Sequence, residues 1–432
     1  MRNALVIVIV CLSVSLLYDV YKEPIDRLLH LDQTETNETT ETGNRKQKTK
    51  KQAQKPDGQQ EEGLPSAYDG RMTGKAPEVK NQGTFGTCWA VVTSSALESR
   101  LLPQEDIVFS ADHISTQNSY AIGQEEGGAY NIAIAYLTAW QGPVTEEMDP
   151  YGDGVAPEGL FPVKHVQEVQ IAEDRDFDAI KEMIYRYGAV QSSIYMDMGG
   201  TKVTSEYYDP ENTSYYYNGE DEVNHDILII GWDDDYPAKN FTKTPSKNGA
   251  FLCQNSWGEG FGDGGRFYVA YDDTQIGRNC VAYTRIDGMD NYDHLYQTDL
   301  CGWVGNMGYK KESCWFANVY TADSTQTLRA VGFYATGPES DYEIYVAADF
   351  KNEMSLVLPK KIQKDHLERK GFYTNDQKKE ISIAEGERFA VMVKINTPGS
   401  DYPVAMEYRA DDQTANVNLE DGCGYVSVDG YR

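Results

Sequence analysis

The chain has 432 residues, a formal net charge of −29 and a hydrophobic content of 40%. This length predicts two folded domains with additional segments, and the strong negative charge argues against nucleic-acid binding, which needs a basic surface. Seven cysteines are too few for a disulfide scaffold in a chain of this size. Because their number is odd, at least one has no partner within the chain.

The first 63 residues show no pattern of a folded domain. An apolar run extends from Ala4 to Tyr18, so residues 1–18 are interpreted as a signal peptide or a membrane anchor. The run is shorter than the roughly 20 residues that span a bilayer comfortably, and no small-x-small cleavage site follows it, so both interpretations stay open. Cys11 within the run is either a lipidation site or simply an apolar residue. Residues 19–63 are polar and rich in lysine, which predicts a disordered tether.

The first segment with the features of a reactive site runs from Asn81 to Ala90 and reads NQGTFGTCWA. After Cys88, apolar residues recur every three or four positions as far as Leu101, which predicts a helix beginning near the cysteine. A helix N-terminus favours a thiolate, and the amide of Gln82, six positions earlier, can donate to an oxyanion. A cysteine is also often a small core residue, but the flanking residues argue against that here.

Further elements of the first domain follow from periodicity. The sequence predicts helices that start near residues 109–113, at residues 132–140 and at residues 176–187, and a strand at residues 191–195. A tyrosine-rich segment at residues 207–217 is expected to form a hairpin or a loop.

A histidine at the head of an apolar run is the next signal. His225 begins the run HDILIIGW, which predicts a histidine held at the start of a buried strand. His113 and His165, in the same domain, are not expected to head buried strands, so His225 is the preferred base. Asp226 is expected to point away from the thiol, with a charge able to raise the imidazole pKa.

An asparagine completes the set. Asn255 follows a short predicted strand and can accept the imidazole N–H of His225, which would fix the tautomer. Trp257, two positions later, would shield this hydrogen bond from water. Cys253 is interpreted as a core residue on the same side of the strand as Asn255.

These segments resemble, in residue type and order, the active-site segments of papain-like cysteine peptidases over residues 64–287. The resemblance implies an α+β fold with two lobes, a helical lobe and a β-barrel lobe. It also implies that Cys88 is the nucleophile, His225 the base, Asn255 its orienting partner and Gln82 an oxyanion donor. No metal and no organic cofactor are expected.

The resemblance also suggests where a substrate binds, and shows where this chain departs from the family. Gly127 and Gly128 would line the cleft, although a plain helix-entry turn is the alternative, and Trp257 and Asn224 are further candidates. Where many relatives have a disulfide, this chain has Phe85 and Glu125, so that bridge is not used. Only about 60 residues precede the domain and they look unstructured, so the usual folded propeptide is not evident.

From residue 288 to 432 short β-rich runs alternate with turns, which predicts an all-β, sandwich-like domain. The predicted strands lie at residues 314–321, 327–336, 341–347, 380–383, 388–395 and 424–428. The segments WFANVY at 315–320 and AVGFY at 330–334 resemble the lectin-like domain that follows some bacterial papain-like peptidases. Cys301 and Cys314 either pair or remain free.

Together these features predict a bacterial cysteine peptidase, secreted or held at the cell surface, that cleaves proteins or peptides. The C-terminal domain is expected to bind cell-surface glycans or the cell wall, and the N-terminal segment to bind a membrane if it is not cleaved. Two alternatives stay open: a cell-wall peptide amidase with the same Cys-His-Asn set, and a catalytically weak surface adhesion protein.

Overall fold

The computed structural model describes residues 5–10, 12–13, 63–199, 202, 204–357, 359–419 and 423–430. The predicted tether at 19–63 and the position of Cys11 lie outside these residues, apart from Gly63. Within the predicted signal or anchor, two short strands are present, β1 (Leu5–Val10) and β2 (Leu12–Ser13). None of the described helices has the length and apolarity that a membrane span requires. A signal peptide or anchor therefore stays a prediction.

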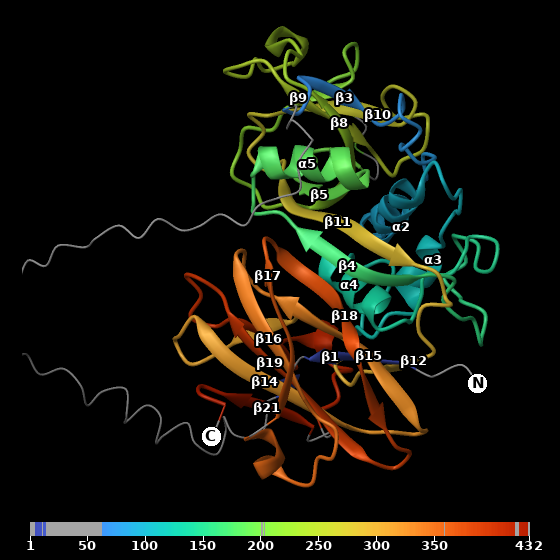
Figure 1. Cartoon of the computed structure of the whole chain (residues 1–432). Helices are drawn as coiled ribbons and strands as arrows, with labels where there is room; N and C mark the ends of the chain where they lie inside the picture. Colours follow the sequence, from blue (N-terminus) through green and yellow to red (C-terminus); the bar gives the residue numbers. More distant parts are fainter. Residues whose placement is uncertain are drawn as a thin grey trace, which may run out of the picture. The chain divides into compact units, whose positions relative to one another are not determined.

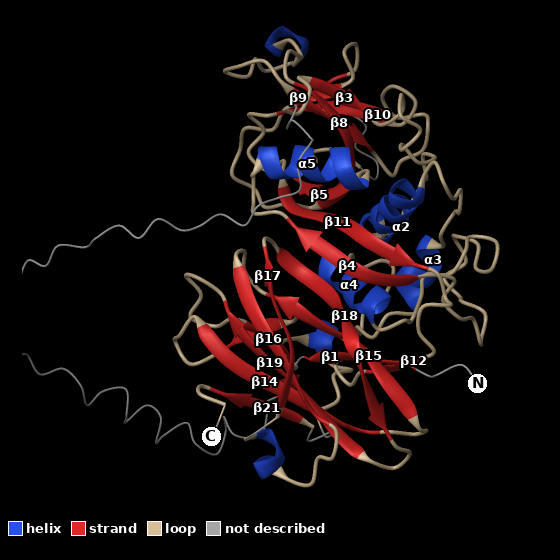
Figure 2. Ribbon diagram, viewed as in Figure 1, coloured by secondary structure: helices blue, strands red, loops and turns tan. Residues whose placement is uncertain are grey.

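In the part of the chain that the structure describes, four α-helices belong to the two lobes of the first domain, and each matches a sequence-based prediction. They are α2 (Cys88–Leu101), α3 (Ala111–Thr116), α4 (Tyr130–Thr138) and α5 (Phe177–Tyr187). Polar caps define two of the starts, because the side chains of Ser110 and Asp176 accept backbone N–H groups of α3 and α5. Almost every residue of α2 is buried, and Figure 2 shows α2, α3 and α4 gathered in one region.

An antiparallel sheet forms the second lobe and supports the candidate site. Its main strands lie in the order β4-β11-β5-β8-β9-β10, and they span His165–Ile171 (β4), Arg278–Asp287 (β11), Val190–Ile194 (β5), His225–Asp233 (β8), Ala250–Gln254 (β9) and Arg266–Ala270 (β10). The first eight residues of β8 are all buried, as its apolar run predicts. Three short strands extend the sheet: β3 (Ala67–Asp69), β6 (Tyr208–Asp209) and β7 (Ser214–Tyr215).

One prediction about the histidines is wrong. His165 does head a mostly buried strand, β4: five of the seven residues of HVQEVQI are buried, and the polar side chains among them obscured the pattern in the sequence. Its imidazole stacks on Trp140 at a ring separation of 3.6 Å and its Nδ1 contacts Asn291 Oδ1 at 2.7 Å. His165 is thus a structural residue away from the candidate site.

The C-terminal domain is the predicted all-β unit. One sheet has the antiparallel order β17-β16-β19-β14-β21, and β15 pairs with β18 opposite it. The bounds are β12 (His294–Tyr296), β13 (Gly305–Met307), β14 (Ser313–Thr321), β15 (Gln326–Ala335), β16 (Ser340–Ala347), β17 (Lys360–Leu367), β18 (Lys370–Ile383), β19 (Arg388–Asn396), β20 (Val404–Glu407) and β21 (Gly424–Ser427). Large buried side chains, among them Phe316, Phe333 and Phe389, fill its core.

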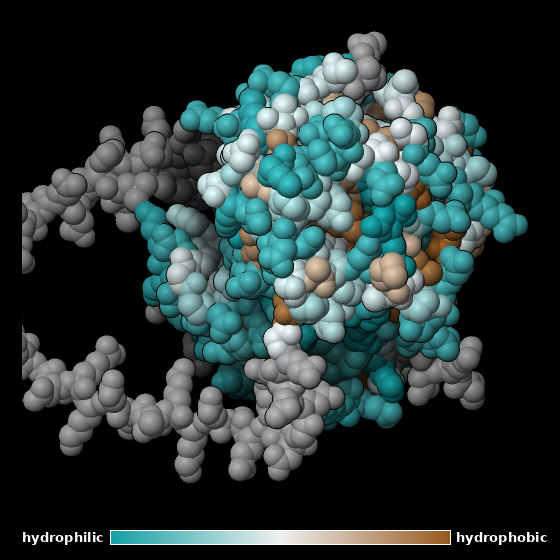
Figure 3. Space-filling model, turned by 90° about the horizontal axis from the view of Figure 1, so that it is seen from above, coloured by the Kyte–Doolittle hydropathy of each residue, from teal (hydrophilic) through white to brown (hydrophobic). Residues whose placement is uncertain are grey.

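The sheets of the two domains are continuous. Strand β18 pairs antiparallel with β4, with Phe372 opposite Val169, and the two strands lie side by side in Figure 1. Cys301 and Cys314 are both free thiols, so the pairing left open for them is not formed. Polar and charged residues dominate the face drawn in Figure 3, as the net charge leads one to expect.

Candidate active site

Cys88 is the first residue of α2, as the sequence predicts. Burial raises the pKa of its thiol to about 12, and the Asp226 carboxylate adds to this increase. Backbone N–H groups of Asp226, Trp89 and Cys88 itself act in the opposite direction and lower the pKa. The helix N-terminus therefore supplies donors that stabilise a thiolate once it forms.

His225 and Asn255 form the second part of the site. His225 begins β8, and Asn255 follows the end of β9. Nε2 of His225 lies 2.8 Å from Oδ1 of Asn255, and both side chains are buried. Burial lowers the pKa of the His225 imidazole to about 4, while the hydrogen bond with Asn255 raises it. The imidazole is thus held in one orientation, through its Nε2 atom.

Trp257 covers this hydrogen bond, as expected. Its ring lies 4.9 Å from the His225 ring, measured between centroids, with an angle of 33° between the planes. Asn81 and Trp257 form an isolated antiparallel bridge, and the Gln82 N–H donates to the Ser256 carbonyl at 2.8 Å. The loop before α2 and the loop after β9 are therefore joined through their backbones.

Gln82 lies in this junction with its amide fixed at both ends. Its Oε1 accepts a hydrogen bond from the Ser256 hydroxyl at 2.6 Å, and its Nε2 donates to the Phe85 carbonyl at 2.7 Å. One amide hydrogen remains for another acceptor. Ser256 was not singled out from the sequence, because its partner is 174 positions away.

Tyr151 is a second residue that sequence reasoning missed. Its hydroxyl donates to the Gln82 carbonyl at 3.0 Å and also hydrogen-bonds the Thr87 hydroxyl. Thr87 immediately precedes Cys88, so Tyr151 contacts both ends of the segment, residues 82–87, that leads to the thiol. A tyrosine in a polar loop gives no local signal of such a role.

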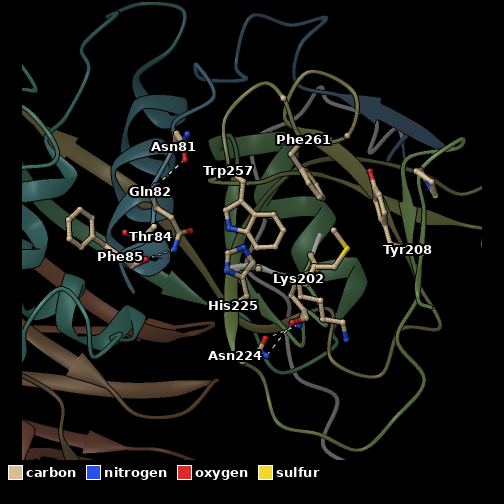
Figure 4. A pocket seen from close by; sticks show the side chains of 17 residues that line it. Asn81, Gln82, Thr84, Phe85, Lys202, Tyr208, Asn224, His225, Trp257 and Phe261 are labelled. Atoms are coloured by element: carbon tan, nitrogen blue, oxygen red, sulfur yellow. Dashed lines mark hydrogen bonds between the residues drawn. The ribbon is translucent and has the colours of Figure 1, made fainter. Parts of the chain in front are cut away.

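A pocket of about 750 Å³ opens beside these residues. Figure 4 shows Gln82 and Phe85 on one side, His225 and Trp257 in the middle, and Phe261 beyond them. Asn224 also lines the pocket, but its amide is engaged with the backbone N–H and carbonyl of Met196. Its contacts thus hold the neighbouring segment in place.

Gly127 and Gly128 stand apart from that pocket lining, beside α2. Gly127 has a φ of +79°, a conformation that favours glycine. A Cβ on Gly128 would lie 2.5 Å from the Trp89 ring. Backbone conformation at Gly127 and packing at Gly128 therefore account for the two glycines, and a contact with substrate stays a proposal.

The expectation for Asp226 needs a correction. Its carboxylate does turn toward the strand β5, where it accepts hydrogen bonds from Gln191 at 2.9 Å and Ser193 at 2.6 Å. Its charge, however, raises the pKa of the Cys88 thiol, and the His225 imidazole shows a lowered pKa caused by burial. The backbone N–H of Asp226, in β8, is a hydrogen-bond donor to the Cys88 thiol. The alternation of side chains along the strand does not reveal this proximity, because it concerns the backbone.

A cysteine at a helix N-terminus, a histidine oriented by an amide and a fixed glutamine amide are typical of thiol peptidases. Residues 64–285 match the model of the papain family cysteine proteases, and residues 295–432 match that of the lectin like domains. The chain belongs to the papain family of cysteine proteases and carries a lectin-like domain.

Individual relatives agree with this assignment. Procathepsin L of Mus musculus is 28% identical over 221 residues, which are 48% of this chain and 61% of the relative. Cathepsin K of Mus musculus is 28% identical over 222 residues, or 48% of this chain and 60% of the relative. The chain thus spans about 60% of the length of these curated relatives.

Solved structures extend the similarity to both domains. The clostridial cysteine protease Cwp84 after propeptide cleavage is similar with a TM-score of 0.74 and 25% identity, covering 85% of this chain and 94% of that chain. A structure of the cysteine protease and lectin-like domains of Cwp84, described as a surface layer associated protein of Clostridium difficile, gives a TM-score of 0.72 at 24% identity, with 85% and 84% covered. The predicted fold, a papain-like unit followed by a β-rich domain, is confirmed.

Proposed function

We propose that this protein hydrolyses peptide bonds in proteins or peptides, with Cys88 as nucleophile and His225 as base. The observation that carries the proposal is the continuous set of hydrogen bonds from His225 through Asn255 and Ser256 to Gln82. The Ser256 N–H donates to Asn255 Oδ1 at 2.8 Å, so the groups that orient the imidazole also orient the amide donor.

In this mechanism His225 takes the proton of the Cys88 thiol. Burial disfavours either charge alone, so thiolate and imidazolium form together as an ion pair. The thiolate sulfur attacks the carbonyl carbon, and the carbonyl oxygen becomes an oxyanion. The Cys88 N–H and the remaining Gln82 amide hydrogen stabilise it.

The second half of the reaction returns the enzyme to its starting state. When the carbon–nitrogen bond breaks, His225 gives its proton to the leaving amine and a thioester remains on Cys88. Water then adds to the thioester, with His225 accepting its proton, and the carboxylic acid leaves as the thiol is restored. Asn255 keeps the imidazole aligned throughout.

For substrate binding, we assign Trp257 and Asn224 to one wall of the pocket and Gly127 with Gly128 to the opposite side of the thiol. The pocket is partly apolar, with Met196, Met198 and Phe261 in its lining. A peptide segment beyond the scissile bond is therefore the expected occupant.

We assign the protein to the bacterial cell surface, secreted or held by residues 1–18, with glycan or cell-wall binding through the C-terminal domain. The similarity to a surface layer associated protease supports this location. A second pocket of about 360 Å³ in the C-terminal domain, lined by Trp315 and Tyr425 among others, offers aromatic faces suited to a sugar ring.

The test is to incubate the full-length protein with a pooled peptide library under reducing conditions. Its Cys88→Ala variant and a Cys423→Ala control, which changes a cysteine of the C-terminal domain, are treated alike. The proposal expects cleavage by the parent and the control and none by Cys88→Ala. Absence of cleavage together with no alkylation of Cys88 would overturn the proposal. Alkylation without cleavage would point to cell-wall peptides as substrates.

A further inference from the structure

Three carboxylates cluster between α3 and the loop at residues 146–154. Ligand oxygens of Asp112, Asp149 and Asp153 all lie within 4.8 Å of one another. Asp112 has 0% and Asp149 1% of its surface exposed, whereas Asp153 lies at the surface. Two buried carboxylates and a third at the surface therefore lie close enough together to share one ligand.

The buried carboxylates are incompletely satisfied. Oδ2 of Asp112 and Oδ2 of Asp149 are buried and, within the described residues, have no hydrogen-bond partner. An unpartnered buried carboxylate oxygen is costly, and two of them near a third like charge are more so. The cluster therefore has buried ligand oxygens that a bound cation would satisfy.

The other oxygens of these aspartates hold the surrounding chain in place. Oδ1 of Asp112 accepts from Gln124 Nε2 at 3.0 Å and from the Gly152 N–H at 3.1 Å. Oδ1 of Asp153 accepts from the Val155 N–H at 3.0 Å. On both residues one oxygen is fixed by the protein and the other remains for a ligand.

Three carboxylate oxygens within 4.8 Å of one another are close enough for a single cation to reach all of them. Calcium is bound by carboxylate, carbonyl and water oxygens at about 2.3–2.6 Å in a flexible geometry. Magnesium demands a near-ideal octahedral geometry and usually keeps several waters with only one or two carboxylates. We propose that Asp112, Asp149 and Asp153 bind a calcium ion, whose remaining ligands are water or neighbouring oxygens.

This site would be coupled to the catalytic loop by direct contacts. Tyr151 lies between Asp149 and Asp153 in the sequence and hydrogen-bonds both the Gln82 carbonyl and the Thr87 hydroxyl. Gln124, which binds Asp112 through its side chain, accepts the Gly86 N–H at 2.7 Å through its carbonyl. A bound ion thus restrains the turn that carries Gln82 and Cys88 from two directions.

The experiment uses the full-length protein after treatment with a chelator. Terbium, which replaces calcium and emits when a nearby tyrosine is excited, is titrated in, and calcium is then used to displace it. Thermal unfolding is followed with calcium or magnesium added. The Asp112→Asn and Asp153→Asn variants test the site, and Glu147→Gln, an exposed change in the same loop, is the matched control.

We expect terbium emission that calcium abolishes, and a calcium-dependent rise in the unfolding temperature of a few degrees in the parent and in Glu147→Gln. Each aspartate variant should weaken calcium binding by about tenfold or more; because Asp153 lies at the surface, its variant tests the site without disturbing the core. Absence of both signals in the parent would overturn the proposal, and so would equal binding by the aspartate variants or an equal effect of magnesium. These readouts do not use peptidase activity, so they are independent of the proposed function.

Discussion

The Ser256 hydroxyl donates a hydrogen bond to Oε1 of Gln82 at 2.6 Å. This contact fixes the orientation of the Gln82 amide, because only its oxygen can accept a hydrogen bond from the hydroxyl while its nitrogen donates. Nε2 is thereby turned toward the Phe85 carbonyl, with its second hydrogen left for an oxyanion. The two halves of the proposed catalytic site, before α2 and after β9, thus depend on each other.

Removing the hydroxyl should therefore weaken catalysis without removing any reacting group. We expect Ser256→Ala to lower kcat by about tenfold with little change in KM, and Gln82→Ala to lower kcat by about 100- to 1000-fold. Initial rates on a cleaved peptide measure both. Ser66→Ala, an exposed change, should leave kcat at the parent value, and an unchanged kcat in Ser256→Ala would contradict the role given to this hydrogen bond.

The charge of Asp226 should set the pH at which the thiol reacts. Since this carboxylate raises the pKa of Cys88, Asp226→Asn should move the midpoint of Cys88 alkylation by iodoacetamide down by about one pH unit. The rate is measured as a function of pH for the full-length protein. Asp235→Asn, on the exposed surface, is the control. An unmoved midpoint, or one displaced upward, would show that the charge does not act on the thiol.

An ion pair with little solvent exposure holds the loop before α2 against the helix itself. Lys80 Nζ contacts Glu98 Oε1 at 2.6 Å, and also donates to Ser94 Oγ and to the Phe109 carbonyl. Lys80→Met leaves the Glu98 charge buried without its partner, so the free energy of unfolding should fall by about 3–5 kcal/mol. Urea unfolding measures this loss. The exposed Lys239→Met should change stability by less than about 0.5 kcal/mol, and a similar small effect at Lys80 would contradict the assignment.

Acid should destabilise the protein through His113. Burial lowers the pKa of this imidazole from 6.5 to about 4 in the folded chain, and its Nδ1 lies 2.6 Å from the Tyr136 hydroxyl. Above pH 6.5 both states are neutral and the stability is complete. As the pH falls from 6.5 to 4, only the unfolded chain binds the proton, so stability is lost over that range.

The variant His113→Gln removes this titration. Comparing urea unfolding at pH 7 and pH 5, we expect the loss of stability in acid to shrink by about 1 kcal/mol relative to the parent. His366→Gln, an exposed change in the C-terminal domain, should leave the loss as it is. An undiminished loss in His113→Gln would place the acid sensitivity elsewhere.

Local patterns predicted the helices, and they nominated the four principal candidate site residues because each stands in a segment with its own short-range signal. The start of α2 at Cys88 follows from a loop with glycines and an apolar period, and His225 follows from the run of β8. Ser256 and Tyr151 could not be found in this way, because their roles lie in contacts with Gln82 at 174 and 69 positions of separation. Sequence spacing does not encode such contacts.

The strands of the C-terminal domain also show what a sequence-based prediction can and cannot find. Runs rich in apolar residues, such as β14 and β19, were predicted with nearly correct bounds. Strand β17 was missed, because lysines occupy much of it and most of its residues are at least partly exposed. The pairing of β18 with β4 across the domain boundary depends on tertiary packing and has no local signal.

The central claim is that His225 activates Cys88. The most direct measurement is the rate at which a peptidyl epoxide adds to the full-length protein and to His225→Ala, with the adduct located by mass spectrometry. The account predicts a single adduct on Cys88 that forms at least about 100-fold more slowly in His225→Ala. Equal rates in the two proteins, or an adduct on another cysteine, would contradict it.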